Sequence, residues 1–246
     1  LALLLTGFSS AFADDGWVLS AEGECDDYTG AAAANGTIGV LHWKEPFSVR
    51  QIVLINVFEL SRKTKVNCPV LGLNPFTIYM TVDGKRVTDW SDWRQCIDMK
   101  NAEHSTAFTA GGKVAVSYSL IALRNLPHVA LFKVKVKALQ DASICFSKTI
   151  TVPEGYRDPV YSNGEFFADG TKIRMQQTSA TTERGRHDVS AASMFIYDQS
   201  EGTYDVSGER GMLKYELSAG EEVDFSVVGS VCPPAESSDP YSEAQR

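Results

Sequence analysis

The sequence predicts an all-β fold, a sandwich or barrel of antiparallel strands, and three observations carry this prediction. Apolar residues recur with a period of two in several segments, as they do in half-buried strands. Turn dipeptides that contain glycine separate these segments at intervals of about 8–12 residues. No window of a dozen residues keeps a helical period with caps at its ends. Many short strands joined by regular turns are typical of β-sandwiches and β-barrels.

The first clear strands are predicted between residues 51 and 87. Residues 51–58 form a nearly continuous β-branched run, which predicts a strand buried on both faces. Residues 76–82 are followed by Asp83-Gly84 and then by residues 85–87. An Asp-Gly dipeptide between two strand-like runs predicts a hairpin with a two-residue turn.

The most regular alternation follows in residues 114–123 and 129–139, and Gly111-Gly112 precedes it as a turn. The second run predicts a strand with one buried face and one solvated face of lysines. A lysine row could also bind an anion, but a solvated face is the simpler interpretation. The buried residues of this run are expected to be Ala130, Phe132, Val134, Val136 and Ala138, opposite Lys133, Lys135 and Lys137. Further strands are predicted at residues 172–177, 212–217 and 223–228, with turns at Asp169-Gly170 and residues 218–222.

The two ends of the chain predict export and a linker. Residues 1–13 resemble the end of a secretory signal peptide, an apolar run closed by Ala11-Phe12-Ala13, with cleavage expected after Ala13. We therefore expect a secreted or periplasmic β-sandwich domain over residues 14–231, with no membrane-spanning segment. Residues 232–246 are polar and rich in proline, which predicts the start of a linker to a further domain that this sequence does not contain.

Composition narrows the class of protein. Hydrophobic residues make up 43% of the chain, as in globular proteins. The net charge of -8 and the sequence pI of about 5.1 argue against nucleic acid as a partner. The five cysteines are widely spaced without a C-x-x-C pair, which excludes the common zinc and thioredoxin patterns.

The residues that usually carry chemistry form no recognisable constellation. The four histidines, at positions 42, 104, 128 and 187, lack metal-binding spacing, and no G-x-S-x-G elbow is present. Adjacent acidic residues occur only at positions 14–15, 26–27 and 221–222, in termini or turns. The sequence therefore predicts no catalytic residue, no metal site and no cofactor. Trp90 and Trp93 look exposed and could stack on sugar rings, although packing in the core explains them at least as well.

A series of short segments resembles the start of glycoside hydrolase family 65, the family of maltose, trehalose and kojibiose phosphorylases and related α-glucosidases. The clearest is Asn35-Gly36 with Gly39, within residues 28–39. The similarity runs in order from about Trp17 to Leu139. Its other segments are residues 17–20, 55–59, 73–76, 82–84, 93–101 and 124–128.

This resemblance implies a large antiparallel β-super-sandwich of the galactose-mutarotase-like kind. In that family the catalytic glutamate lies in an (α/α)6 barrel that follows the sandwich, so no catalytic residue can be assigned in this chain. The sandwich is expected to pack against its own C-terminal barrel and to shape the rim of the pocket that binds an α-linked glucoside. A homodimer is a further expectation for the partners of this chain. Because a sugar phosphate is useful to a cell only inside it, an exported relative is predicted to be a hydrolase.

Six residues are candidates for the rim of that pocket or for structural motifs: Asn35, Gly36, Gly39, Trp90, Trp93 and Asp98. A structural role is favoured for the first three, with Asn35 bonding backbone at a turn and the glycines allowing a positive φ or close backbone approach. Asn35-Gly36-Thr37 is also an N-glycosylation sequon. Two alternatives stay open. One is a stand-alone secreted carbohydrate-binding protein, and the other is the first domain of another sandwich-plus-barrel glycosidase such as an α-L-fucosidase.

Overall fold

A computed structural model describes residues 16–23, 28–61, 64–168 and 170–232. Within these residues every regular element is a β-strand, which confirms the predicted all-β fold. All neighbouring strands pair antiparallel. The predicted signal peptide and nearly all of the predicted linker lie outside the described residues. The described part of the chain contains no helix long and apolar enough to cross a membrane.

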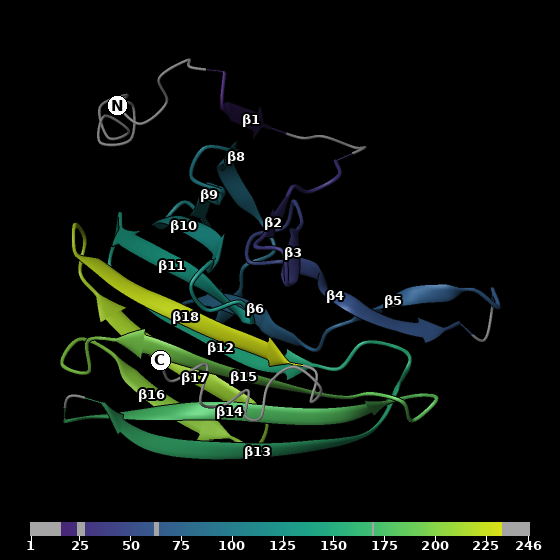
Figure 1. Cartoon of the computed structure of the whole chain (residues 1–246). Coiled ribbons are helices and arrows are strands. Elements are labelled where there is room, and N and C mark those ends of the chain that lie inside the picture. The colour runs from purple at the N-terminus through teal and green to yellow at the C-terminus, as the bar shows by residue number, and fades with distance from the viewer. Residues whose placement is uncertain (1–15, 24–27, 62–63, 169, 233–246) are drawn as a thin grey trace.

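The strands form three sheets (Figure 1). The nine-stranded sheet contains, in spatial order, β1 (Val18–Glu22), β8 (Trp90–Asp98), β9 (Glu103–Ala110), β10 (Val114–Ala122), β11 (Val129–Ala138), β18 (Glu222–Cys232), β15 (Asp188–Tyr197), β14 (Thr171–Thr182) and β13 (Tyr156–Ala168). The five-stranded sheet contains β16 (Thr203–Ser207), β17 (Arg210–Leu217), β12 (Ala142–Thr151), β6 (Asn74–Val82) and β7 (Lys85–Arg86). The four-stranded sheet contains β2 (Ala32–Ala34), β3 (Ile38–His42), β4 (Val49–Leu60) and β5 (Asn67–Leu71).

The core lies between the nine-stranded sheet and the two smaller sheets. Aromatic contacts join the five-stranded sheet to the nine-stranded sheet. The ring centroids are 5.1 Å apart for Phe76 and Phe132 and 4.7 Å apart for Phe146 and Phe225. The four-stranded sheet packs its inward residues against β9 and β10, beside the same core. This arrangement of one large sheet facing two smaller ones is the antiparallel β-super-sandwich that the resemblance implies.

The alternating segments behave as predicted. Along β11 the five expected apolar residues are buried, while Lys133 and Lys135 are exposed. β10 buries its inward side chains in register with them, for example Val116 opposite Val136. The predicted hairpin is also present, because Asp83 and Gly84 adopt φ values of 51° and 74° between β6 and β7. Positive φ at both turn residues matches the right-handed twist of the two strands.

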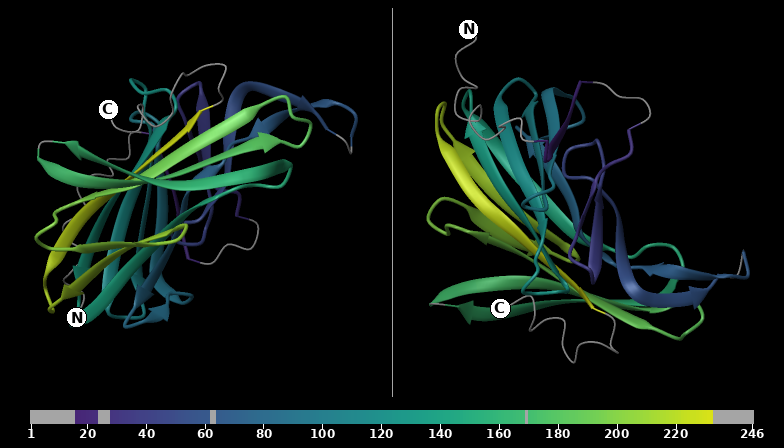
Figure 2. Two further views of the ribbon diagram at one scale, coloured as in Figure 1. Left: turned by 90° about the horizontal axis from the view of Figure 1, so that it is seen from below. Right: turned by 45° about the horizontal axis from the view of Figure 1, so that its top comes forward.

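The prediction that residues 51–58 are buried on both faces is wrong. In β4, Ile52 and Leu54 are buried, but Ile55 is 37% exposed and Phe58 is 52% exposed. The physical reason is the position of the strand: the end of β4 pairs with β5 in an arm that projects beyond the core (Figure 2). This largely apolar run therefore belongs to a strand that is buried in part and exposed in part.

Candidate functional site

The Asn35 side chain forms four hydrogen bonds that join the four-stranded sheet to the nine-stranded sheet, and we call these bonds the Asn35 clamp. Its Oδ1 accepts hydrogen bonds from the backbone N–H groups of Thr37 at 2.9 Å and Ile38 at 3.0 Å, which closes the turn between β2 and β3. Its Nδ2 donates to the carbonyl oxygens of Leu123 at 2.7 Å and Pro127 at 2.9 Å, in the connection between β10 and β11. A glycan would be attached through this same nitrogen. Glycosylation of the sequon would therefore disrupt the clamp.

The two glycines of the motif differ in their roles. Gly36 adopts a φ of 95°, a conformation that side chains disfavour, so glycine is required at this turn. Gly39 lies in β3, and a Cβ built there would meet Ala34 and Val53 only at 3.8 Å, an ordinary contact distance. The expectation of positive φ or close backbone approach therefore holds for Gly36 and is wrong for Gly39.

The two tryptophan candidates differ in how deeply they are buried. Trp93 is only 8% exposed, its Nε1 donates to the Lys44 carbonyl at 2.8 Å, and its ring meets Tyr28 edge-on at 5.7 Å. The expectation that it looks outward is wrong, because it lies at an inward position of β8. Trp90 is half-buried against the core and borders a groove between β4 and the β6–β7 hairpin. Trp93 in turn borders a hollow of about 1040 Å³ beside β9 and β10, so each tryptophan lines a different cavity.

Asp98 closes a turn at the end of β8. Its Oδ1 accepts hydrogen bonds from the backbone N–H groups of Lys100 at 2.9 Å and Asn101 at 3.1 Å, and its Oδ2 accepts from the Asn101 side chain at 2.6 Å. These hydrogen bonds, that of the Asn101 N–H first, lower the pKa of Asp98, so the group stays ionised. Among the described residues, no hydrogen bond or ring contact joins any two of the six candidates. They form separate local contacts and not one site.

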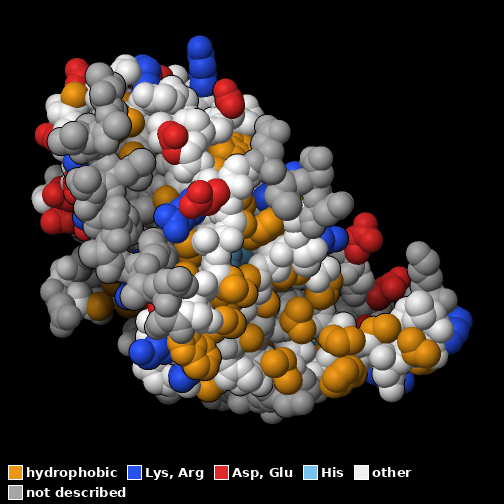
Figure 3. All heavy atoms as spheres, turned by 90° about the horizontal axis from the view of Figure 1, so that it is seen from above, with side chains coloured by type: hydrophobic (Ala, Val, Ile, Leu, Met, Phe, Trp, Pro, Cys, Tyr) orange, Lys and Arg blue, Asp and Glu red, His pale blue; other side chains and the backbone are white. Residues whose placement is uncertain are grey.

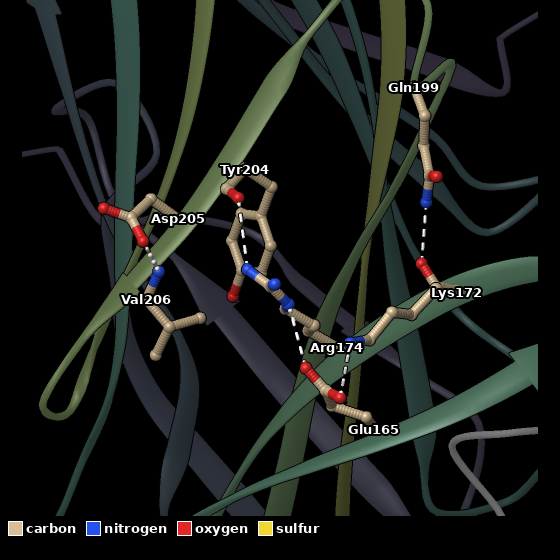
Figure 4. Close-up of polar contacts among 7 residues, drawn as sticks. All are labelled: Glu165, Lys172, Arg174, Gln199, Tyr204, Asp205 and Val206. Carbon is tan, nitrogen blue, oxygen red and sulfur yellow. Dashed lines mark hydrogen bonds and ion pairs between the residues drawn. The ribbon is translucent and has the colours of Figure 1, made fainter.

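The other acidic groups that stand out are held in ion pairs or turns. Figure 4 shows Glu165 between two cations, with Oε2 2.6 Å from Lys172 Nζ and Oε1 3.0 Å from Arg174 Nε. Arg174 also donates to the Tyr204 carbonyl at 3.4 Å and so ties β14 to β16. The hydrogen bond from Lys172 contributes most to lowering the pKa of Glu165. Glu222 likewise accepts from Lys137 at 2.7 Å, and this contact lowers its pKa.

A general acid for glycoside hydrolysis needs the opposite environment, one that raises the pKa of a carboxyl group. The five described carboxyl groups whose pKa is shifted all have it lowered: Asp83, Asp98, Glu165, Asp198 and Glu222. Nor do the described residues contain a group of three or more His, Cys, Asp or Glu side chains arranged to hold a metal ion.

A buried polar cluster around His42 is the main feature that the sequence did not reveal. His42 Nε2 lies 2.8 Å from Tyr118 Oη and Nδ1 lies 3.1 Å from Gln95 Nε2. Its ring stacks on that of His104 with centroids 4.5 Å apart. Tyr28 Oη donates to Gln95 Oε1 and completes the chain of contacts. The cluster therefore bonds the four-stranded sheet to the nine-stranded sheet.

Both histidines of this cluster are neutral at pH 7. Burial, and then the repulsion that a protonated His104 would exert, holds the pKa of His42 well below its usual range. Burial lowers the pKa of His104 to about 4. A signal for the cluster was present in the sequence, because His42 and His104 occupy inward positions in alternating strands where apolar residues are the rule.

An apolar surface covers the projecting arm of β4 and β5, and Figure 3 shows hydrophobic side chains gathered over it. Ile55 and Phe58 are exposed there, as is Val66 at 56%, just before β5. The arm is anchored to the large sheet, because Thr182 Oγ1 donates to Glu59 Oε1 at 3.0 Å. Exposed apolar side chains on an anchored element make this arm a candidate interaction face. Val66 lies on the other face of the arm, because Ser61 pairs with Val66 whereas Phe58 pairs with Pro69. We call the exposed side chains of Ile55 and Phe58 the arm surface.

Comparison with known proteins shows what this chain is similar to. No family model matches the chain. The kojibiose hydrolase of Mucilaginibacter mallensis is 27% identical over 251 residues, covering 96% of this chain, and that of Flavobacterium johnsoniae is 24% identical over 255 residues, covering 99%. The chain spans 37% of the length of each of these relatives.

The fold is shared with a solved structure named "Putative kojibiose phosphorylase from human microbiome". The two superpose with a TM-score of 0.69 at 13% identity, over 93% of this chain and 34% of the other. The names of the two bacterial relatives describe hydrolysis of kojibiose, and that of the solved structure describes a kojibiose phosphorylase. The resemblance to glycoside hydrolase family 65 is therefore confirmed, and the chain is similar to the N-terminal β-sandwich domain of that family.

Proposed function

We propose that this family-65-like chain is the non-catalytic, N-terminal β-sandwich domain of a secreted glycoside hydrolase that acts on α-glucosides. Residues 1–13 would direct export, and residues 232–246 would lead into an (α/α)6 barrel that carries the catalysis. The arm surface is the observation that carries the proposal, because a domain that works alone has no reason to hold such a face rigidly in water. The named activity of the two bacterial relatives, hydrolysis of kojibiose, supports a hydrolase rather than a phosphorylase.

The arm surface supports packing against the barrel for two reasons. Its apolar side chains gain free energy when they leave water, about 25 cal/mol for each Å² buried. Its position is also fixed, since His187 Nε2 lies 3.2 Å from the Phe58 carbonyl oxygen and reinforces the contact between Thr182 and Glu59. A fixed apolar face can set the orientation of a neighbouring domain, which a mobile loop cannot do.

The lowered pKa of the shifted carboxyl groups supports the non-catalytic part of the proposal. Glu165 and Glu222 are each held between cations and stay ionised, so neither can donate a proton to a leaving sugar at neutral pH. The catalytic pair of carboxyl groups would then belong to the barrel, and this domain would support the barrel and the rim of its pocket.

The experiment uses the full-length protein divided into two polypeptides, this chain and the remainder. We expect neither part to release glucose from kojibiose alone, and the two to associate and regain activity when mixed. Phe58→Asp should weaken that association at least tenfold, because it places a charge in the buried face. Phe167→Asp is the matched control, since Phe167 is 72% exposed on β13, away from the arm.

Two results would contradict the proposal. Glucose release by this chain alone would make it catalytic, and association that survives Phe58→Asp but is lost in Phe167→Asp would place the interface elsewhere. Phosphate separates the two reaction types. Equal glucose release with and without phosphate is expected, whereas strict dependence on phosphate would make the parent a phosphorylase.

A further inference from the structure

A groove with a volume of about 660 Å³ lies between β4 and the β6–β7 hairpin, where the four-stranded and five-stranded sheets adjoin. Its size falls in the usual range for sites that bind small molecules, about 300–1,000 Å³. Polar side chains border it, including Gln51, Thr77 and Thr88, together with Trp90. Two arginines, Arg50 from β4 and Arg86 from β7, also line it.

Each of these arginines is held against an aromatic ring. The Arg50 guanidinium lies 4.4 Å from the ring centroid of Trp43, and the Arg86 guanidinium lies 4.1 Å from that of Tyr79. Stacking fixes the plane of a guanidinium group and leaves its N–H edges free to donate. A pre-organised guanidinium loses less conformational entropy when it binds a carboxylate or phosphate in the bidentate manner.

The described residues supply no carboxylate within 4.0 Å of either arginine, and neither forms an ion pair there. Other cations of the protein do have such partners, as Arg94 has in Glu22 at 3.0 Å. The charged residues that line the groove are Arg50, Arg86 and Glu45, so their charges sum to +1 on a chain whose net charge is -8. The groove is thus a locally positive site on an acidic protein, which favours a small anion.

We propose that this groove binds the carboxylate or phosphate group of a small, sugar-sized anion. Arg50 from β4 and Arg86 from β7 donate to the anionic group, and Trp90 borders the space that receives the rest of the ligand. Neutral glucosides would not gain from the two arginines. The site is therefore separate from the glucoside pocket proposed for the barrel, and its presence or absence leaves that proposal unchanged.

Isothermal titration calorimetry of the chain tests this at constant ionic strength. The probes are glucose 1-phosphate, inorganic phosphate, glucuronate and glucose. We expect saturable binding of at least one anion with a Kd on the order of 1 mM, and no binding of glucose. The comparison of the phosphate probes with glucuronate shows whether the groove binds a phosphate group or a carboxylate group.

Variants locate the site. Arg50→Gln and Arg86→Gln should each weaken binding by about tenfold, the loss expected for a charge-assisted bidentate contact. Arg86→Lys should weaken it less, because the charge is kept while the planar fork is lost. Arg210→Gln is the matched control, since Arg210 is an exposed arginine of β17 that does not line the groove.

Thermal melting of each variant separates lost binding from lost folding. The proposal is overturned if no anion binds saturably at 20-fold the expected Kd, if glucose binds as well as its phosphate, or if Arg210→Gln weakens binding as much as the groove variants. If both glutamine variants melt below the wild type, the Arg86→Lys variant provides the test. If this variant binds the anion as tightly as the wild type does, the assignment of Arg86 to the anion site is overturned.

Discussion

Lowering the pH from 7 to 5 should reduce the free energy of unfolding by about 2 kcal/mol through His104 alone. Burial lowers the pKa of His104 from its ordinary 6.5 to about 4. Between these two values the unfolded state binds a proton that the folded state does not bind, so stability falls as the pH falls. The linkage relation with these two values gives about 2 kcal/mol by pH 5 and about 3 kcal/mol by pH 4. His42, whose pKa is also lowered by burial, acts in the same direction.

The variant His104→Phe isolates this effect, because a phenyl ring can still stack on His42 but cannot take up a proton. Urea unfolding at pH 5, 6 and 7, at constant ionic strength, measures it above the range in which most carboxyl groups titrate. The variant should lose about 2 kcal/mol less than the wild type over this range. Val116→Ala, in the buried row of β10, should instead lower stability by about 2 kcal/mol at every pH. An unchanged pH dependence in His104→Phe would refute the argument.

Three further predictions follow from particular contacts. Asn35→Ala should lower the free energy of unfolding by about 2 kcal/mol in urea, because four backbone groups lose their hydrogen-bond partner. Asn35→Asp keeps the acceptor oxygen and should lower it less. Mass spectrometry of the protein secreted from a glycosylating host should find no glycan on Asn35. Gly229→Ala should lower the free energy of unfolding by about 2 kcal/mol, because the added Cβ would lie 2.5 Å from the Phe76 ring. Gly39→Ala should change it by less than about 0.5 kcal/mol. Equal effects of the two variants in thermal melts would contradict this. Lys148→Met removes a buried amine that donates to Gln176 Oε1 at 2.7 Å, and urea unfolding from pH 7 to pH 10 compares it with the wild type. Burial holds the pKa of Lys148 well below its usual range, so wild-type stability should rise with pH toward 10.5, and the variant should lack that rise.

Local sequence signals predicted the parts of the fold that depend on neighbouring residues. The Asp83-Gly84 turn could be predicted because positive φ at two successive residues is a property of those residues. The buried row of β11 could be predicted because alternation has one explanation when lysines occupy the other face. Both features need no knowledge of what lies across the core.

The features that escaped prediction depend on distant parts of the chain. Whether Phe58 is buried depends on how far β4 extends past the core, which its own sequence does not state. Trp93 looked exposed because polar residues surround it, but its partners are Lys44 and Tyr28, far away in the sequence. The second half of the Asn35 clamp likewise depends on a connection 88 residues further along the chain. Contacts of this kind become visible only when the sheets are assembled.

Two groups of polar residues, the Asn35 clamp and the His42 cluster, hold the four-stranded sheet in place. The Asn35 clamp joins it to the connection between β10 and β11, and the His42 cluster joins it to β8 and β10. This sheet carries the arm surface and, through Arg50, one wall of the groove. A buried hydrogen-bonded network tolerates few alternative arrangements, because any shift leaves a polar group without a partner. The network thus gives precise placement to a sheet that the apolar core alone would hold less specifically, and placement is what an interaction face requires.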